Sequence, residues 1–295
     1  MSSSAGERVG LIGVGLMGAA LAERLLKSGF NVLGWDTNPG RLGLLKPLGG
    51  DAASSPGQVF LGCDRVLLSL PDSRTVESVL HSAELRSRQI IIDTTTGDPR
   101  MAESLGRKLA ARSIAYLDAT ISGNSAQVRA SDVVLMVGGE KEAFDRCQDL
   151  FRCFAREIVH TGPIGSGMNL KLVTNLVMGL NRAALAEGLV FARALGLDLA
   201  LTLQILQGNM AYSRIMETKG SKMIAADWRA DAKLSQHLKD VRLMLEAAER
   251  LDVALPLTDQ HRQLLELAES LGFGELDNSA ILRAIENCRG TDLPP

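Results

Sequence analysis

Three glycines near the start of the chain restrict its fold more than any other feature. Gly13, Gly15 and Gly18 form the pattern G-x-G-x-x-G within and directly after an apolar segment and directly before a segment with helical periodicity. In that setting the first glycine permits a tight turn, the second lets the backbone approach a pyrophosphate, and the third lets helix pack on strand. The helix N-terminus adds unpaired N–H groups and a partial positive charge. The pattern predicts a dinucleotide-binding turn made of Gly13, Val14, Gly15, Leu16, Met17 and Gly18; the alternative is a glycine-rich turn without a ligand.

An acidic residue, Asp36, ends the next β-rich segment. A carboxylate at this place can accept hydrogen bonds from the adenosine ribose hydroxyls, and it repels a 2′-phosphate. Thr37 stands where an arginine would favour the phosphate, although Arg41 is close enough in sequence to reach one. We therefore predict NAD as the cofactor, with NADP as the alternative. A purely structural reading of Asp36 is a turn before residues 38–40.

The first half of the chain alternates between β-rich and helical segments. Several β-rich segments are continuous apolar runs, which are typical of strands buried on both faces of a parallel sheet. Alternation of this kind predicts a Rossmann-type, doubly wound α/β domain. The expected strands are 8–14, 30–35, 65–70, 89–93, 114–118, 133–137 and 157–161, and the expected helices are 17–27, 100–111 and 142–154.

The second half is helical in pattern, and no convincing strand follows Gly165. Glycines and prolines separate the helical segments. We therefore predict a nucleotide-binding domain over residues 1–164 and an all-helical domain over residues 165–295, which begins with a long helix. The expected helices are 169–195, 199–207, 235–251, 256–270 and 279–288.

Composition excludes several classes of protein. Lys and Arg number 32 against 34 Asp and Glu, so the formal net charge is -2, which argues against a nucleic acid as the main partner. No apolar stretch approaches the length of a membrane span, and the first residues do not resemble a secretory signal. No C-x-x-C or H-E-x-x-H pattern occurs, so we expect no metal site. The expected location is the cytoplasm.

A lysine in an apolar helix is the candidate for proton transfer. Lys171 lies near the start of the long helix, and Asn175 follows one turn later on the same face. The surrounding residues are apolar nearly all round, which indicates a buried helix. Burial lowers the pKa of a lysine and so suits it to proton transfer near neutrality. The alternative is a lysine whose amine extends to solvent. A tyrosine with a lysine four residues later, as in short-chain reductases, is absent.

Several short segments, taken in order, carry a resemblance to a known family. They are 13–18, Leu70-Pro71-Asp72-Ser73, Asp93-Thr94-Thr95-Thr96, 118–124, Gly165-Ser166-Gly167 leading to Lys171 and Asn175, and Lys239-Asp240. With these segments the whole chain, from about Arg8 to the final helix, resembles the β-hydroxyacid dehydrogenases. That family includes 3-hydroxyisobutyrate dehydrogenase, tartronate semialdehyde reductase and the glyoxylate and succinic semialdehyde reductases.

The resemblance implies roles for individual residues. Lys171 would be the catalytic acid/base, and Asn175 would be its partner and a substrate contact. Lys239 would reach the cofactor from the helical domain, through which the family forms homodimers or homotetramers. The remaining implied contacts are Leu70, Pro71 and Thr75 along the cofactor, Thr96 near its nicotinamide, and Ser122, Gly123 and Asn124 on the substrate carboxylate.

Each of these segments also has a structural reading. Residues 122–124 can form a plain turn, the threonines after Asp93 can cap the next helix, and Lys239-Asp240 can be a solvated pair. The loop also departs from the family's usual Asp-Ala-Pro-Val-Ser-Gly-Gly, since Thr120, Ile121 and Asn124 replace Pro, Val and the second Gly. These three differences put the identity of the substrate in question, whereas the expected type of reaction is unchanged.

The implied function is hydride transfer between a nicotinamide cofactor and a small β-hydroxy acid or semialdehyde. The expected substrate belongs to the class of 3-hydroxyisobutyrate, tartronate semialdehyde, succinic semialdehyde and glyoxylate. Two alternatives remain open at this point. One is an NADPH-dependent enzyme similar to imine reductases, suggested by the altered loop, and the other is a non-catalytic dinucleotide-binding interaction protein. An intact Lys171 argues against both alternatives.

Overall fold

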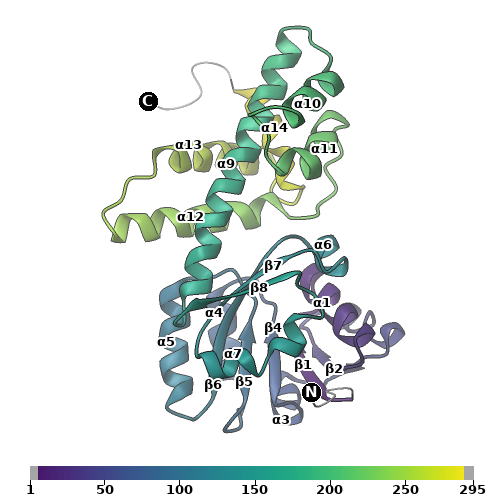
Figure 1. The fold of residues 1–295 in the computed structure, drawn as a ribbon, viewed down its shortest axis with the longest axis vertical. Helices are drawn as coiled ribbons and strands as arrows, with labels where there is room; N and C mark the ends of the chain where they lie inside the picture. The colour runs from purple at the N-terminus through teal and green to yellow at the C-terminus, as the bar shows by residue number, and fades with distance from the viewer. Residues whose placement is uncertain (1–5, 289–295) are drawn as a thin grey trace. The chain divides into compact units, whose positions relative to one another are not determined.

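The computed structural model describes residues 6–288. They form two compact units, and the first unit ends at Lys171 while the second begins at Leu172. The division falls inside the long helix α9 (Ser166–Ala194), so the first residues of this helix belong to the first unit. Figure 1 shows a sheet in one unit and only helices in the other.

The first unit contains an eight-stranded sheet with the order β3-β2-β1-β4-β5-β6-β7-β8. This arrangement confirms the predicted doubly wound α/β fold, and β3 is a short edge strand that the pattern did not reveal. The strands are β1 (Arg8–Ile12), β2 (Asn31–Trp35), β3 (Asp51–Ala52), β4 (Arg65–Leu68), β5 (Ile90–Asp93), β6 (Ala115–Ser122), β7 (Val134–Gly138) and β8 (Glu157–Gly162).

One strand pair departs from the expected parallel sheet. Strand β7 runs antiparallel to β6, whereas the other neighbouring strands pair in parallel. A parallel connection needs a crossover of a dozen or more residues, usually through a full helix. Only residues 123–133, with the short helix α6 (Ser125–Arg129), join β6 to β7, so the chain turns back instead.

Helices cover both faces of the sheet. Successive strand residues point to opposite faces: Leu67 joins the core under α1, α6, α7 and α8, whereas Val66 and Leu68 join the core under α3, α4 and α5. This explains why the strands read as continuous apolar runs. The helices are α1 (Leu16–Lys27), α2 (Pro39–Leu42), α3 (Pro56–Gly62), α4 (Ser73–His81), α5 (Pro99–Ala110), α7 (Lys141–Asp145), α8 (Gln148–Phe151) and the short 3-10 turn η1 (Lys46–Leu48).

The segment predicted as one helix, 142–154, is two short helices, α7 and α8. The break lies at Arg146 and Cys147, and Cys147 has φ −111 and ψ 2. The carbonyl oxygen of Arg146 accepts a hydrogen bond from Arg65 Nη1 at 2.9 Å. The Arg65 side chain, distant in sequence, therefore donates a hydrogen bond to the backbone at the break between α7 and α8.

The second unit has a single core among its helices. The bounds predicted for 199–207 and 256–270 are confirmed, but Met216–Gly220, a π-helical turn, and α11 (Ser221–Ile224) were missed. Among residues 6–288, no helix combines the length and apolarity needed to span a membrane. The remaining elements are α10 (Leu199–Gln207), α12 (Leu234–Arg250), α13 (Pro256–Ser270), the 3-10 turn η3 (Asn278–Ala280) and α14 (Ile281–Asn287).

Candidate functional site

The candidate site lies at the carboxyl ends of the parallel strands. Strands β2, β1, β4, β5 and β6 pair in parallel, so their carboxyl ends lie on the same side of the sheet unit. Strands β2 and β3 follow β1 on one side of the sheet, and strands β5 to β8 follow β4 on the other side, so the strand order reverses between β1 and β4. In open α/β sheets, ligands bind at such a switch point, outside the carboxyl ends of the strands. The loops after β1 and β4 flank this point.

Close packing requires glycine at two positions, one in the turn after β1 and one in the first turn of α1. Gly13 has φ +94, and a Cβ atom there would lie 2.2 Å from the carbonyl oxygen of Ser69. A Cβ atom on Gly18 would lie 1.9 Å from the carbonyl oxygen of Gly13. A side chain at either position would therefore separate the turn from α1 or from the loop after β4.

Gly15 serves a different purpose. A Cβ atom there would meet nothing closer than Arg41 Nη1, at 3.9 Å. Helix α1 starts at Leu16 directly after it, and no side chain caps this N-terminus. Val14 is buried, Met17 is half-buried and Leu16 is exposed. The turn thus leaves open space beside uncapped N–H groups, which fits the needs of a pyrophosphate.

Asp36 stabilises the turn after β1 through hydrogen bonds to backbone N–H groups. Its side chain is buried, and its Oδ2 atom accepts a hydrogen bond from the Val14 N–H at 2.7 Å. Its Oδ1 atom accepts one from the Asn38 N–H at 2.8 Å, so the turn-forming role considered for this residue is present. The Nη1 atom of Arg41 lies 3.6 Å from Oδ2. A carboxylate and a guanidinium therefore stand together at the end of β2.

The loop after β4 is ordered by a helix cap. Asp72 caps α4 and accepts hydrogen bonds from the N–H of Thr75 at 2.8 Å and from its hydroxyl at 2.9 Å. The N–H of Leu70 donates to Thr95 Oγ1 at 3.3 Å, and Pro71 is exposed. The cap positions Thr75, and the bond to Thr95 joins this loop to the next one.

The loop after β5 is tied to its neighbours. Thr94 donates from its N–H and its hydroxyl to the Leu68 carbonyl oxygen, at 2.9 and 2.8 Å. Thr96 is half-buried at the following turn. The idea that the threonines cap the next helix is wrong, because Asp98 caps α5 by accepting from the Arg100 N–H. The threonines instead bind β4 to β5 at the candidate site.

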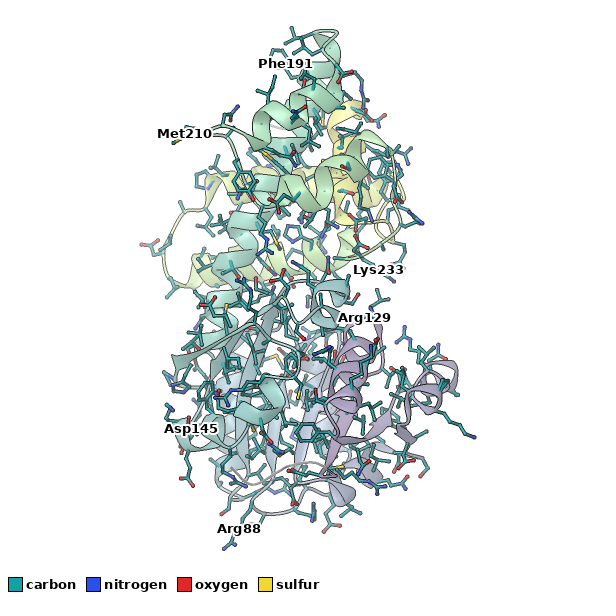
Figure 2. All side chains as sticks on the ribbon, turned by 45° about the vertical axis from the view of Figure 1, so that its right-hand side comes forward. Arg88, Arg129, Asp145, Phe191, Met210 and Lys233 are labelled. Carbon is teal, nitrogen blue, oxygen red and sulfur yellow. The ribbon has the colours of Figure 1, made fainter. Side chains whose placement is uncertain are left out.

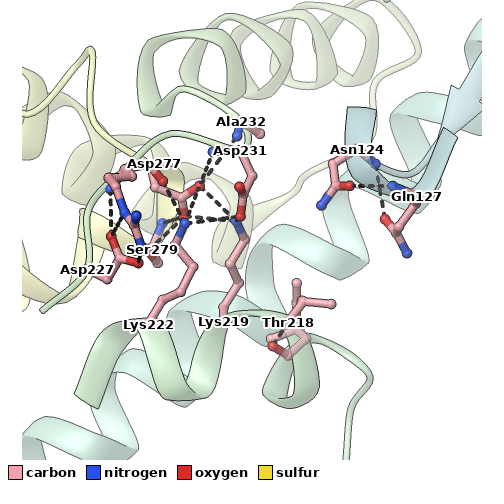
Figure 3. A network of polar contacts seen from close by, with 12 residues as sticks. Asn124, Gln127, Thr218, Lys219, Lys222, Asp227, Asp231, Ala232, Asp277 and Ser279 are labelled. Carbon is pink, nitrogen blue, oxygen red and sulfur yellow. Dashed lines mark hydrogen bonds and ion pairs between the residues drawn. The ribbon is translucent and has the colours of Figure 1, made fainter. Parts of the chain in front are cut away.

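The end of β6 carries the residues expected to bind a carboxylate. Ser122 ends the strand, and Gly123 has φ +151, where a Cβ atom would lie 2.5 Å from Val133 Cγ1. Asn124 forms a capping box with Gln127: its Oδ1 atom accepts from the Gln127 N–H at 2.9 Å, and its own N–H donates to Gln127 Oε1 at 3.0 Å (Figure 3). The backbone N–H of Asn124 is thus bonded within its own loop and does not offer a hydrogen bond to the substrate carboxylate.

A buried aspartate that sequence reasoning gave no role, Asp118, anchors the start of α9. Its two oxygen atoms accept hydrogen bonds from the N–H groups of Gly165 and Met168, each at 2.8 Å. Burial raises the pKa of this carboxyl to about 6. The hydroxyl of Thr120, one of the departures from the family loop, donates to the Gly167 carbonyl oxygen at 2.9 Å. The signal in the sequence was a carboxylate inside an otherwise buried strand.

The anchored helix carries Lys171 about one turn after its start. Lys171 is 6% exposed and Asn175 is 4% exposed. In the second unit, the Nδ2 atom of Asn175 donates to Asp240 Oδ2 at 3.0 Å, while its Oδ1 atom is buried without a hydrogen-bond partner among the described residues. Lys239 Nζ lies 3.3 Å from Asp240 Oδ1. Asp240 thereby fixes the orientation of the Asn175 amide.

Metal-binding residues do not gather at these loops. Over residues 6–288, no group of three or more His, Cys, Asp and Glu side chains is placed to hold a metal ion.

Comparisons with known proteins cover both parts of the chain. Residues 8–162 match a family model described as the NAD binding domain of 6-phosphogluconate dehydrogenase. Residues 165–285 match one described as NAD-binding of NADP-dependent 3-hydroxyisobutyrate dehydrogenase.

Individual relatives extend over nearly the full length. The 2-hydroxy-3-oxopropionate reductase of Escherichia coli K12 is 31% identical, covering 95% of this chain and 97% of its own. The 2-(hydroxymethyl)glutarate dehydrogenase of Eubacterium barkeri is 29% identical, covering 97% of each chain. The crystal structure of a 3-hydroxyisobutyrate dehydrogenase from Salmonella typhimurium has a similar fold, with a TM-score of 0.87 at 23% identity, covering 94% of this chain and 99% of that one.

Proposed function

Because this chain belongs to the β-hydroxyacid dehydrogenase family and is an NAD(P)-dependent oxidoreductase, we propose that it interconverts a small carboxylate-bearing semialdehyde or keto acid and the matching hydroxy acid. The class comprises 3-hydroxyisobutyrate, tartronate semialdehyde, succinic semialdehyde and glyoxylate. Among observations on this molecule, the buried Lys171 on a helix whose first turn is bonded to the sheet carries the proposal furthest.

Lys171 is the proposed general acid/base. When bound, NAD(P) supplies or accepts the hydride. In reduction, the protonated amine polarises the substrate carbonyl and then delivers its proton to the oxygen; in oxidation, the neutral amine takes the hydroxyl proton. Two hydrogen bonds from the first turn of α9 to Asp118 support this role, because they hold the helix backbone just ahead of the lysine. Positioning of this kind contributes directly to rate.

Asn175 is the proposed partner of Lys171. One helical turn separates the two residues, so they share a face of α9. The bond from Nδ2 to Asp240 leaves the Oδ1 atom of Asn175 as a buried acceptor without a partner among residues 6–288. An acceptor in that state favours a donor such as an ammonium group or a substrate hydroxyl, because an unpaired buried polar atom costs free energy.

Ser122 and Gly123 are the proposed holders of the substrate carboxylate. The capping box of Asn124 removes its backbone N–H from this task. Its Nδ2 group has no hydrogen bond among the described residues, and we assign this amide to the substrate instead. A side-chain donor reaches further than a backbone N–H, which favours substrates with an additional oxygen beyond the carboxylate.

The remaining assignments concern the cofactor. Gly13, Gly15 and Gly18 with the start of α1 would bind the pyrophosphate. Asp36 would accept from the ribose and favour NAD, although Arg41 beside it offers a contact to the 2′-phosphate of NADP. Further proposed contacts are Leu70, Pro71, Thr75 and Thr96 from the loops after β4 and β5, and Lys239 from α12.

The helical unit is the proposed oligomerisation unit, in a homodimer or homotetramer located in the cytoplasm. Helix α9 exposes Val173, Val177 and Phe191, and Leu195 follows directly after its end; each is at least 52% exposed. Figure 2 labels Phe191, whose ring projects from the helix. Large exposed apolar patches mark interaction sites in folded proteins. We also propose that residues 1–164 bind the cofactor and residues 165–295 complete the substrate site.

The test is NADH and NADPH consumption by the purified protein against a panel of short semialdehydes, 2-oxo acids and cyclic imines. We expect turnover with at least one carboxylate-bearing aldehyde or keto acid and none with imines. Turnover confined to imines would favour an imine reductase. Cofactor binding without turnover of any panel member would contradict the proposed substrate class.

A further inference from the structure

A cluster of basic side chains lies inside the helical unit and contains no residue used above. Arg182 of α9 is 1% exposed, His237 of α12 is 5% exposed and His261 of α13 is 3% exposed. The Nε2 atoms of the two histidines are 3.0 Å apart and share a hydrogen bond. A Cβ atom on Gly179 would lie 2.6 Å from His237 Nε2. The glycine thus makes room for the rings about one turn before Arg182.

Arg182 is a buried cation without a hydrogen-bonded partner for two of its nitrogen atoms. Its Nε and Nη2 atoms are buried and find no acceptor among residues 6–288. Burial lowers the pKa of this guanidinium to about 10, so it remains protonated at neutral pH. Buried charges are paired or hydrogen-bonded in folded proteins, because an isolated one costs several kcal/mol or more.

The nearby carboxylate, Asp277, does not supply the hydrogen-bond acceptor that Arg182 lacks. Its charge acts on Arg182 and raises the pKa of the guanidinium, yet both of its oxygen atoms accept from Lys219 Nζ at 2.8 Å. They also accept from the Asp231 N–H at 2.9 Å and the Ser279 hydroxyl at 2.8 Å (Figure 3). Lys219 is itself 5% exposed. Asp277 is therefore already paired with a buried lysine, and it offsets the charge of Arg182 only from a distance, without a hydrogen bond to the guanidinium.

The two histidines add donors without adding negative charge. Burial, and the positive charge of Arg182, lower the pKa of His261 to about 3, so its ring is neutral at pH 7. Its Nδ1 atom is buried without a partner among the described residues. In the tautomer that accepts from His237 at Nε2, the proton of His261 sits on Nδ1. The cluster then contains unfilled donors on two residues and a net positive charge.

We propose that a monovalent anion about the size of chloride binds at Arg182, between α9, α12 and α13. Only an acceptor with negative charge satisfies the guanidinium N–H groups and balances the charge together. A small ion is required because Arg182, His237 and His261 are almost fully enclosed. Because the ion would connect three helices of one core, it would stabilise the helical unit. The chemical step would be unchanged.

The test measures thermal unfolding of the full chain in sodium bromide and in sodium gluconate at equal ionic strength. A ligand that binds only the folded state raises its melting temperature, and we expect a rise of roughly 3 °C for the wild type in bromide. Arg182→Met should show no rise, and in gluconate it should unfold above the wild type because the unpaired charge is gone. Arg193→Met, on the same helix but in a surface ion pair with Glu286, should retain the wild-type rise.

A crystal of the wild-type protein grown in bromide gives an independent measurement if Arg182→Met does not fold. We expect an anomalous peak within about 3.5 Å of the guanidinium nitrogen atoms. Two results would overturn the proposal: an equal bromide response in the wild type and in Arg182→Met, or a map with only water at Arg182.

Discussion

At the scale of single residues, the amine of Lys171 is the group on which the proposed chemistry depends. Lys171→Ala should still bind NADH but lose turnover by about 10²- to 10⁴-fold, the usual contribution of general acid–base catalysis. Binding is measured by quenching of intrinsic fluorescence or by calorimetry, and turnover by the absorbance of NADH. Lys108→Ala, which removes an exposed lysine paired with Glu77, serves as the control. Near-normal turnover by Lys171→Ala would exclude the lysine as the acid/base.

Asp36 combines a structural bond with a proposed role in cofactor choice. Asp36→Ala should weaken the binding of both cofactors, because the Val14 N–H loses its acceptor. It should also narrow the preference for NAD over NADP by about tenfold, since removal of a repulsion of about 1.4 kcal/mol changes a ratio by that factor.

The measurement for Asp36 is kcat/KM with each cofactor, compared as a ratio. Arg41→Met is the matched variant, because it removes the neighbouring positive charge and should shift the ratio toward NAD. An unchanged ratio in Asp36→Ala would show that other residues select the cofactor.

At the scale of elements, the carboxyl of Asp118, which joins β6 to the start of α9, makes the stability of the folded protein depend on pH, because its burial disfavours the ionised form. Its pKa in the folded state, about 6, is above the ordinary value of 3.8. The folded state therefore binds the proton more tightly, so the resulting stabilisation is fully present below about pH 4 and is lost as the pH rises through 6. The loss amounts to about 3 kcal/mol by about pH 7.

Asp118→Asn removes this titration. The free energy of unfolding of the wild type, measured with urea from about pH 3 to pH 7, should fall relative to that of the variant by about 3 kcal/mol. Asp145→Asn, at an exposed aspartate of α7 paired with Lys141, should follow the wild-type dependence. Parallel curves for the wild type and Asp118→Asn would contradict the raised pKa.

The helices and strands themselves were largely predictable. The apolar runs and the 3.6-residue periodicity located the main strands and the long helices, with ends that differ by a few residues. Helix α3 was missed because its seven residues make about two turns, too few for a periodic apolar pattern to stand out. At the interruption between α7 and α8, the Arg146 carbonyl oxygen accepts from Arg65, a residue far away in the chain.

At the scale of the whole molecule, the apolar residues exposed on α9 are expected to be covered in an oligomer. Val177→Glu places a charge on this surface, where Val177 is 52% exposed. The mutant should have the mass of a single chain by sedimentation or light scattering, while the wild type should have at least twice that mass. Leu48→Glu, which alters an exposed leucine of the sheet unit, should leave the mass unchanged. A wild type with the mass of one chain would refute the proposal.

The candidate site was predictable only in part. The glycine turn, Asp36 and Lys171 were recognisable from residue type and spacing, because a tight turn, a carboxylate after a strand and a lysine in an apolar helix each leave a local pattern. The role of Asp118 in holding α9 was not recognisable, because it joins a strand to backbone groups far away in the chain. The capping box of Asn124 and Gln127 was missed, although a polar residue followed three positions later by Gln is a local signal for it.

The sequence by itself determined the order of the main strands and long helices along the chain, the position of the dinucleotide-binding turn and the helix that carries the amine. These features follow from local rules: the φ that only glycine adopts readily, the alternation of a strand and the period of a helix. Tertiary structure alone decided that β7 reverses direction, that Asp118 binds the start of α9 and that the Nε and Nη2 atoms of Arg182 are enclosed without a hydrogen-bond partner among residues 6–288. Each of these depends on segments brought together by folding, and the free energy of a buried charge or an unpaired N–H is set by those neighbours.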